Sequence, residues 1–398
     1  MIAPPPLTLF DLAVCAAVVV PFALLVGHRA AIPMLPPARG GAKLPRVSVV
    51  LAARDEAQAV GASVSSLLAQ DYPDLEVITV DDRSADGTGA ILREIAARDP
   101  RLRTIRIDAL PAGWLGKAHA LWRGADRASG DWILFTDADV IFSPDALRRA
   151  ISYAGGEGLD HLTLSPLLIS RGFLLRAFVA FFAYAFIALW GAYLANDPTS
   201  ARGVGIGAFN LVRRDAYLAI GTMRALALRP DDDIRLGRRL RGFGFRQRVL
   251  NGREVIRVEW YGSLGAAIRG LEKSLYASLE YRVRDTIGVL ALILGTMVWP
   301  YAGAILLGGV DRALLAVVIA CLVAGFIETY RQAFGRLGAR AAISAALLPI
   351  SALCFAYAIA RSAVLAERRG VCWRGTRYPL AMLRAQSGLE GARAKRSR

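Results

Sequence analysis

The chain has 398 residues, 55% of them hydrophobic, a mean hydropathy of +0.40 and a formal net charge of +16 from 49 basic and 33 acidic residues. This composition excludes intrinsic disorder and argues against a purely soluble protein, whose mean hydropathy would be negative. Four cysteines are too few for a disulfide scaffold. With three histidines and no Cys-x-x-Cys pair, the sequence also argues strongly against a structural zinc site.

The first apolar segment covers residues 7–27 and is about long enough to cross a bilayer, which takes roughly 20 residues. No basic residue precedes it, whereas several follow it, the first of them Arg29. A cleaved signal peptide is the alternative, but such a peptide begins with basic residues. We therefore expect residues 1–28 to be a retained anchor in the inner membrane, with the chain from Arg29 onward facing the cytoplasm.

Three further apolar runs lie near the C-terminus, in an expected membrane region over residues 286–365. If all three crossed the bilayer after one anchor, the chain would end outside. Yet residues 367–398 carry nine Lys/Arg and two Glu, and a basic tail over 366–398 should stay in the cytoplasm. Either one run is re-entrant or interfacial, with Pro300 and Pro349 as candidate breaks, or the N-terminal orientation is reversed. The three runs are 286–310, 313–330 and 341–365.

A fifth apolar stretch, residues 173–195, lies in the middle of the chain and contains Arg176. Its eight aromatic residues favour a helix that lies at the membrane interface. A buried core helix and a true membrane span are the alternatives.

Between the membrane runs, short β-branched segments alternate with helical patterns. This alternation predicts an α/β fold with a mostly parallel sheet that is covered on both faces. Ligands of such sheets bind beyond the carboxyl ends of the strands. We expect one helix over Glu56–Gln70, and another that has Ser143 and Pro144 as its N-cap and first residue. The strands are expected at 47–53, 75–80, 103–107 and 132–136.

Acidic residues follow three of these strands, at Asp55-Glu56, Asp81-Asp82 and Asp137-Ala138-Asp139, and a later helix begins after Asp231. A single Asp can be a helix cap or favour a helix dipole. Three acidic groups at one edge of one sheet, however, require a cation. Their oxygen ligands suit Mg²⁺ or Mn²⁺, which bridges to substrate phosphates. The pattern therefore indicates a nucleotide diphosphate ligand, although the sequence has neither a P-loop nor a dinucleotide fingerprint.

Four segments resemble, in order, the motifs of family 2 glycosyltransferases of the GT-A fold, over about residues 45–280. Three others are similar to segments of membrane-bound, lipid-modifying members. These members include ceramide glycosyltransferases and the enzymes associated with hopanoid and carotenoid synthesis. The resemblance implies a Rossmann-like, mixed and mostly parallel sheet between N-terminal and C-terminal transmembrane helices. The four segments that resemble the family motifs are 54–57, 80–88, 137–139 and 232–236. The three that resemble membrane-bound members are 113–117, 207–214 and 373–378.

The resemblance also implies roles for individual residues. Asp233 would be the general base beside Asp232, and Asp139 would bind the metal together with Asp137. The mechanism would be inverting. Trp373, Arg374 and Arg377 would serve the acceptor side, with a membrane aromatic belt as the alternative for this segment. The nucleotide sugar would be bound by Arg54, Glu56, Asp82, Lys117 and Asp137.

The sequence departs from the family pattern in three places. Asp55 replaces the usual Asn of an Arg-Asn-Glu motif, and Asp232 replaces the usual Glu of a Glu-Asp pair. The Gln-x-x-Arg-Trp motif of processive polysaccharide synthases is missing from residues 260–290. Its absence favours transfer of a single sugar. The expected membrane spans, which are too few to form a polymer channel, favour the same conclusion.

The sequence thus predicts a membrane-bound, metal-dependent enzyme that moves one sugar from a nucleotide sugar, UDP-linked by resemblance, to a lipid hydroxyl. One alternative is the same chemistry on a polyprenyl phosphate or a growing polysaccharide. Another is a non-catalytic membrane scaffold or nucleotide-sugar sensor. Nucleic acid is excluded as a partner, because the basic residues flank apolar segments as anionic lipids require. The sequence does not specify the sugar, the acceptor lipid or the oligomeric state.

Overall fold

The computed structural model describes residues 9–27, 32–41, 44–188 and 191–386. Its contacts divide the chain into two units, and each unit is made of separate segments. Unit 1 comprises Met1–Ala31, Ser170–Gly191 and Trp260–Arg384. Unit 2 comprises Ile32–Ile169, Ala192–Glu259 and Ala385–Arg398. The domain boundaries expected from the sequence, 45–280 among them, stay a prediction.

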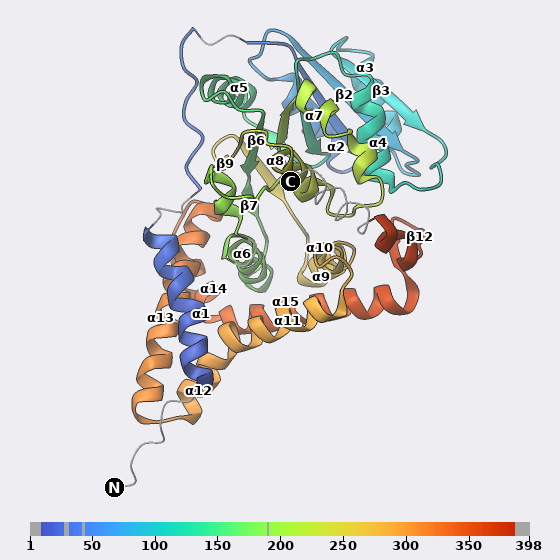
Figure 1. Ribbon diagram of the computed structural model, residues 1–398. Helices are drawn as coiled ribbons and strands as arrows, with labels where there is room; N and C mark the ends of the chain where they lie inside the picture. Colours follow the sequence, from blue (N-terminus) through green and yellow to red (C-terminus); the bar gives the residue numbers. More distant parts are fainter. Residues whose placement is uncertain (1–8, 28–31, 42–43, 189–190, 387–398) are drawn as a thin grey trace. The chain divides into compact units, whose positions relative to one another are not determined.

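A seven-stranded sheet in the order β3-β2-β1-β4-β8-β6-β9 forms the centre of unit 2 (Figure 1). Strand β8 pairs antiparallel with both of its neighbours, and all other pairs are parallel. This arrangement confirms the mixed, mostly parallel α/β fold. In chain order the strands are β1 (Val47–Ala53), β2 (Leu75–Asp82), β3 (Leu102–Ile107), β4 (Trp132–Asp137), β6 (His161–Ser165), β8 (Asn210–Arg213) and β9 (Gln247–Asn251).

The sheet forms because its central strands are apolar on both faces. Alternate residues of β1 enter two separate cores: Val49 and Leu51 pack on one side, and Val50 packs on the other. Each fully buried Val or Leu contributes about 1.5–3 kcal/mol of stability. Residues of α2 (Val60–Leu68), α3 (Thr88–Ala96) and α5 (Ala146–Gly156) line the first core, and residues of α4 (Gly116–Asp126), α7 (Arg214–Ala219) and α8 (Asp232–Gly242) line the second.

Two helix starts differ from the sequence prediction. The helix expected from Glu56 begins at Val60, because the preceding residues form the loop after β1. The prediction that Ser143 and Pro144 open a helix is wrong, since α5 begins at Ala146. The Ser143 N–H instead donates to the Val255 carbonyl at 2.8 Å, beside a three-stranded sheet. That sheet contains β5 (Ile141–Phe142), β10 (Ile256–Glu259) and β7 (Leu167–Ile169).

Unit 1 is helical within the residues that the structure describes, apart from one hairpin. Three helical stretches are long and apolar enough to cross a membrane: 283–306, 309–334 and 348–369. The helices are α1 (Leu9–Gly27), α6 (Phe173–Ala188), α9 (Leu264–Leu271), α10 (Leu275–Ser278), α11 (Val283–Ile293), α12 (Trp299–Leu306), α13 (Gly309–Phe334), α14 (Ala339–Ala346) and α15 (Leu348–Arg369). The hairpin contains β11 (Val371–Trp373) and β12 (Thr376–Tyr378).

Helix α6 forms the first part of the apolar stretch 173–195. Within unit 1 it packs against α13, α14 and α15, and the rings of Phe178 and Phe181 lie 6.4 and 5.7 Å from the ring of Phe355. Both of these phenylalanines are buried. The helix is therefore covered by protein on a broad face, and its expected place at a membrane interface stays a prediction.

The two prolines that marked possible breaks both stand at helix starts. Pro300 lies in the first turn of α12, directly after a π-helical segment, Leu294–Val298. Pro349 lies in the first turn of α15. The first apolar run is thus made of α11, the π-helical segment and α12 rather than one regular helix.

Candidate active site

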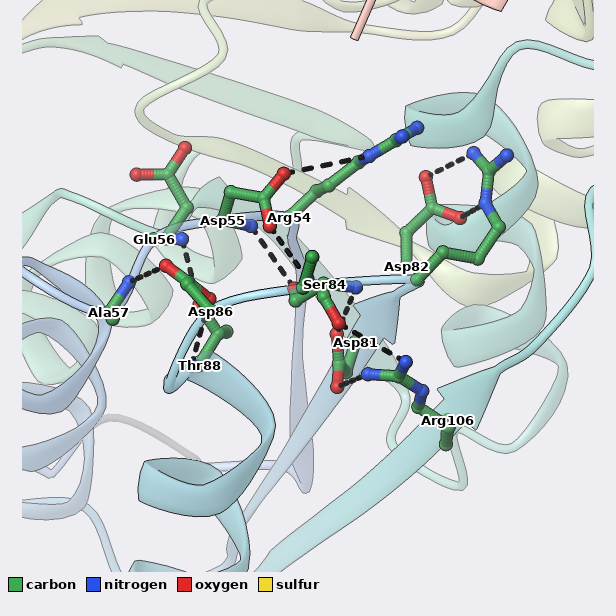
Figure 2. Close-up of polar contacts among 12 residues, drawn as sticks. Arg54, Asp55, Glu56, Ala57, Asp81, Asp82, Ser84, Asp86, Thr88 and Arg106 are labelled. Carbon is green, nitrogen blue, oxygen red and sulfur yellow. Dashed lines mark hydrogen bonds and ion pairs between the residues drawn. The ribbon is translucent and has the colours of Figure 1, made fainter. Parts of the chain in front are cut away.

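The loops after β1 and β2 are joined by side chains that bond to backbone groups (Figure 2). Asp55 has a left-handed backbone, with φ of 54°. Its N–H donates to the Ser84 hydroxyl at 3.1 Å, and its Oδ1 accepts from the Ala85 N–H at 2.8 Å. An Asn carbonyl oxygen could accept the same bond, and both residue types tolerate this backbone. Asp55 therefore fits where the family motif has Asn.

A second pair of bonds fixes the turn that carries Glu56. The Glu56 N–H donates to the Thr88 hydroxyl at 2.8 Å, and the Ala57 N–H donates to Asp86 Oδ2 at 3.0 Å. Asp86 also accepts from the Thr88 hydroxyl, and this bond, before any other, lowers the pKa of Asp86. Glu56 thus projects from a turn whose backbone N–H groups are bonded to the side chains of Thr88 and Asp86 (Figure 2).

The two acidic residues that end β2 have arginine partners (Figure 2). Buried Asp81 forms an ion pair with Arg106 and accepts from the Ser84 N–H at 3.1 Å. Asp82 receives two bonds from Arg83, at 2.8 and 2.9 Å. A Cβ on Gly116, the first residue of α4, would lie 2.3 Å from Asp82 Oδ2, so only glycine allows this approach.

Lys117, the residue after Gly116, lies between the end of β4 and the start of α8. Lys117 Nζ lies 2.7 Å from Asp137 Oδ1 at the end of β4, and 4.0 Å from Asp232 Oδ1 at the start of α8. Burial alone would lower the pKa of Lys117, but the carboxylates of Asp137, Asp232 and Asp233 raise it. Lys117 is therefore a permanent cation among three carboxylates.

Asp139 stands in a crowded anionic environment. Burial, followed by the charges of Asp137 and Glu56, raises the pKa of Asp139 to about 7. Among the described residues, no three His, Cys, Asp or Glu side chains could hold a metal ion by themselves. The Asp137–Asp139 pair nevertheless fits Mg²⁺ or Mn²⁺, because these ions commonly take one or two carboxylates and complete their coordination with water and substrate phosphate.

Asp233 lies in the first turn of α8 and is oriented by two backbone donors. Its Oδ2 accepts from the Gly207 N–H at 2.9 Å, and its Oδ1 accepts from the Ile234 N–H at 2.8 Å. Burial raises the pKa of Asp233 in spite of the opposing charge of Lys117. A Cβ on Gly207 would lie 2.6 Å from Asp137 Oδ2 and 3.2 Å from Asp233 Oδ2, so this glycine sits between the two carboxylates.

Asp231, two residues earlier, has the opposite environment. It receives two bonds from Arg229, both at 2.8 Å, and one from Arg235 at 2.9 Å. Although its burial opposes ionisation, the two arginines lower the pKa of Asp231 to about 2. Arg229 is fully buried. Asp231 is thus part of a structural ion-pair cluster that the sequence did not predict.

A buried polar network holds the glycine-rich segment that carries Gly207. His161 lies between Asn210 and Gln247, with its Nε2 3.1 Å from Asn210 Oδ1. Because the Gln247 amide donates to Nδ1, the proton of the neutral ring is on Nε2. Asn210 Oδ1 also accepts from the Ile206 N–H at 3.3 Å. No motif revealed this network, and its only sequence signal is a polar residue at the start of each of three strands.

The structure brings most of the expected site residues together within unit 2. Arg54 Nε lies 3.9 Å from Asp55 Oδ2 in the loop after β1. Trp373, Arg374 and Arg377 belong to unit 1, in the β11–β12 hairpin, where Lys273 Nζ lies 4.5 Å from the centre of the Trp373 ring. Their role with the acceptor stays a prediction.

Comparison with known families identifies the part of the chain that carries this site. Residues 48–221 match the family model for glycosyl transferase family 2. The match includes the loops after β1, β2 and β4 and the segment that carries Gly207. It ends before Asp231–Asp233, so the residues of α8 lie outside it.

Curated relatives align with a limited part of the chain. The succinoglycan biosynthesis protein ExoO of Rhizobium meliloti is 39% identical over 116 residues, which are 29% of this chain and 32% of the relative. The beta-monoglucosyldiacylglycerol synthase of Synechocystis is 37% identical over 111 residues, 27% of this chain and 23% of the relative. The chain therefore spans only about a quarter to a third of the length of these relatives.

A solved structure supports the fold over most of the chain. The mannosyltransferase PcManGT from Pyrobaculum calidifontis, in complex with GDP-Man and Mn²⁺, superposes with a TM-score of 0.50 at 18% identity. The superposition covers 90% of this chain and 98% of the mannosyltransferase. At this level of identity the likeness shows the fold.

Proposed function

We propose that the protein is a family 2 glycosyltransferase, as the family match over residues 48–221 supports, and that it transfers a single sugar from a nucleotide diphosphate sugar to a hydroxyl group of a lipid, with inversion at the anomeric carbon. The observation that carries this proposal is the group of Asp137, Asp139, Asp232 and Asp233 around Lys117. It combines oxygen ligands for a cation with a separate, backbone-oriented carboxylate. A donor diphosphate and an acceptor hydroxyl need these two functions.

Asp137 and Asp139 are the residues that would hold Mg²⁺ or Mn²⁺. The raised pKa of Asp139 supports this assignment, because it indicates that the positive charge nearby does not balance the negative charge of the surrounding carboxylates. A bound divalent cation would neutralise the charge that develops on the leaving diphosphate. Lys117 adds a fixed positive charge at the same place. We assign Arg54, Glu56 and Asp82 to the nucleoside end of the donor.

Asp233 would act as the general base. It takes the proton of the acceptor hydroxyl while the hydroxyl oxygen bonds to the anomeric carbon. The bond between that carbon and the diphosphate breaks on the opposite side, and the nucleoside diphosphate leaves. A raised pKa makes Asp233 a stronger base at neutral pH, and the Gly207 and Ile234 N–H groups orient it. Asp231 is unsuitable, since two arginines bind it.

Two observations favour a lipid acceptor. Unit 1 contains three helical stretches that are long and apolar enough to enter a membrane. The relative from Synechocystis bears the name of a diacylglycerol glycosylating enzyme. A growing polysaccharide is the second candidate, because the Rhizobium relative belongs to succinoglycan biosynthesis. We place the enzyme in the cytoplasmic membrane with unit 2 on the cytoplasmic side, and we assign the donor as UDP-linked.

The experiment is a transfer assay with membranes that contain the full chain. Each labelled donor is supplied with Mn²⁺ or with EDTA, and the label that enters the organic extract is measured. The donors are UDP-glucose, UDP-galactose, UDP-N-acetylglucosamine and GDP-mannose. The expected result is a labelled lipid from one donor that is lost with EDTA and in Asp233→Asn. Release of the label by mild acid would instead indicate a polyprenyl phosphate acceptor.

A matched variant separates loss of chemistry from loss of folding. Asp215→Asn changes another aspartate in the first turn of a helix, α7, whose side chain is 64% exposed and pairs with Arg213 outside the site. It should keep full activity. If folded protein binds nucleotide but labels no lipid from any donor, the lipid proposal is wrong, and a glycan acceptor or a non-catalytic sensor takes its place.

A further inference from the structure

Two of the apolar stretches in unit 1 run in a different direction from the others. Helices α11 and α15 pack side by side, and both cross the direction of α1 and α13 at a steep angle (Figure 1). Helix α13 packs against α1 and α12. A bilayer normal that follows α1 and α13 would therefore leave α11 and α15 close to the membrane plane.

Helix α11 is too short to span a bilayer by itself. Its 11 residues extend about 16 Å, and the hydrocarbon core is about 30 Å thick. The run continues only through the π-helical segment and Pro300, where the backbone changes direction before α12. Residues 283–306 thus contain enough apolar residues for a span but do not form one straight helix.

Helix α15 is long enough, with 22 residues, but polar residues in its second half bond to other segments of unit 1. Arg361 pairs with Glu272, and the Ser362 hydroxyl donates to the Glu272 carbonyl. Glu367 near its end bonds to Tyr276 and Arg384. If α15 crossed the bilayer, the segment around Glu272 would enter the hydrocarbon with it, and each charged residue there would cost about 2.5–3.5 kcal/mol.

Both helices also carry exposed apolar side chains, and on α15 these share a face with Arg361, which bonds to Tyr357. On α15, Ile350, Leu353, Tyr357 and Val364 follow the spacing of one helix face, and between 47% and 55% of each is accessible. On α11, Val283 and Ile287 are 51% and 61% accessible. These six side chains are therefore about half exposed in the part of the chain that the structure describes. We call them the apolar stripe.

Basic residues stand at one end of the apolar stripe. Arg282 and Arg284 flank the start of α11, with 63% and 86% of their side chains exposed. Arg368 and Arg369 end α15 and are exposed as well. Apolar side chains beside exposed arginines match the two layers of a membrane interface, acyl chains below and anionic phosphates above.

We propose that α11 and α15 lie in the interfacial layer of an anionic phospholipid leaflet, with the apolar stripe towards the acyl chains, while α12 and α13 form a hairpin that enters the bilayer. The chain after Arg369 then stays on the same side as the chain before Val283. This resolves the conflict in the sequence, because the basic tail remains on the side where the positive charges require it. The proposal does not depend on the reaction that unit 2 catalyses.

The first test uses sidedness. Cys372 is a native, exposed cysteine just after α15. Cys15, Cys321 and Cys354 are replaced by Ser, and a second variant carries Gly338→Cys with Cys372→Ser. Gly338 precedes α14, and nothing lies within 4 Å of a Cβ placed there. A membrane-impermeant maleimide should label both positions from the same face of sealed vesicles. Labelling from opposite faces would mean that α15 spans the bilayer.

The second test measures depth. The full chain, spin-labelled at one position at a time, is placed in vesicles of phosphatidylcholine and phosphatidylglycerol. The stripe variants are Ile287→Cys, Ile350→Cys, Leu353→Cys, Tyr357→Cys and Val364→Cys. All five should report a similar, shallow depth. Val310→Cys and Val317→Cys on α13 should differ from each other in depth. A steady change of depth from position 350 to position 364 would overturn the proposal.

Discussion

At the scale of single residues, the start of α8 holds two aspartates in opposite environments, Asp231 at the N-cap and Asp233 in the first turn. Asp233→Asn should lower the transfer rate by a factor of about 10²–10⁴, the usual contribution of a general base. Nucleotide binding and melting temperature should stay close to those of the unchanged protein, because Asn can still accept one of the two backbone bonds. The transfer assay and thermal melting with nucleotide check both parts.

Asp231→Asn should have a different effect. It leaves the fully buried Arg229 without its carboxylate, and breaking a buried ion pair costs about 3–5 kcal/mol of folding stability. We expect a lower melting temperature, with the activity per folded molecule largely kept. If Asp231→Asn removed activity without loss of stability, the assignment of the base would have to move from Asp233 to Asp231.

His161 predicts a loss of stability in acid. Burial lowers its pKa to about 4, against about 6.5 in the unfolded chain. Between these values the unfolded state binds more protons, so stability falls as the pH drops through 6.5 towards 4. The loss reaches about 2 kcal/mol at pH 5. Melting at pH 7 and pH 5 should show a smaller acid shift for His161→Gln than for the unchanged chain.

At the scale of elements, Gly207 links the glycine-rich segment to α8. Gly207→Ala would place a methyl group between Asp137 and Asp233 and displace at least one of them. A displacement of about 1 Å can cost about 10²-fold in rate, so we expect a loss of that order in the transfer assay. Gly155→Ala, where a Cβ meets nothing within 4 Å, is the matched control and should be fully active.

The sequence predicted the elements whose pattern is local. β1, β2 and β4 are mostly apolar runs with carboxylates at or just after their ends. The hydrophobic pattern and the composition of these segments were therefore enough to predict the strands. The antiparallel β8 has four residues and gave no such signal. The pairs Arg229–Asp231 and His161–Asn210 join residues whose polar types give no hint of burial, and only tertiary structure reveals them. The helix expected at Ser143 begins at Ala146, with Asp145 at its N-cap, and the Ser143 N–H bonds to the carbonyl of Val255, a residue distant in the sequence.

At the scale of the whole molecule, the two carboxylates of the proposed cation site predict coupled binding. Mn²⁺ alone should raise the melting temperature little, since Asp137 and Asp139 leave most ligand positions to water. Mn²⁺ with a nucleoside diphosphate should raise it by more than the sum of the separate shifts, because each ligand supplies contacts for the other. EDTA should reverse the excess. Additive shifts would show that the nucleotide binds without the metal.

The segment that carries α6 interrupts unit 2, and this has a consequence for synthesis. When residue 169 leaves the ribosome, β8 and β9 do not yet exist, so β6 has neither of its partners and the carboxylates of β4 lack those of α8. A strongly apolar helix must be made next, before the sheet can close. Newly made chains therefore pass through a stage in which an open sheet edge and an apolar helix are exposed together. Slowing translation just after residue 191 would prolong this stage and favour aggregation, whereas slowing it after residue 259 would not.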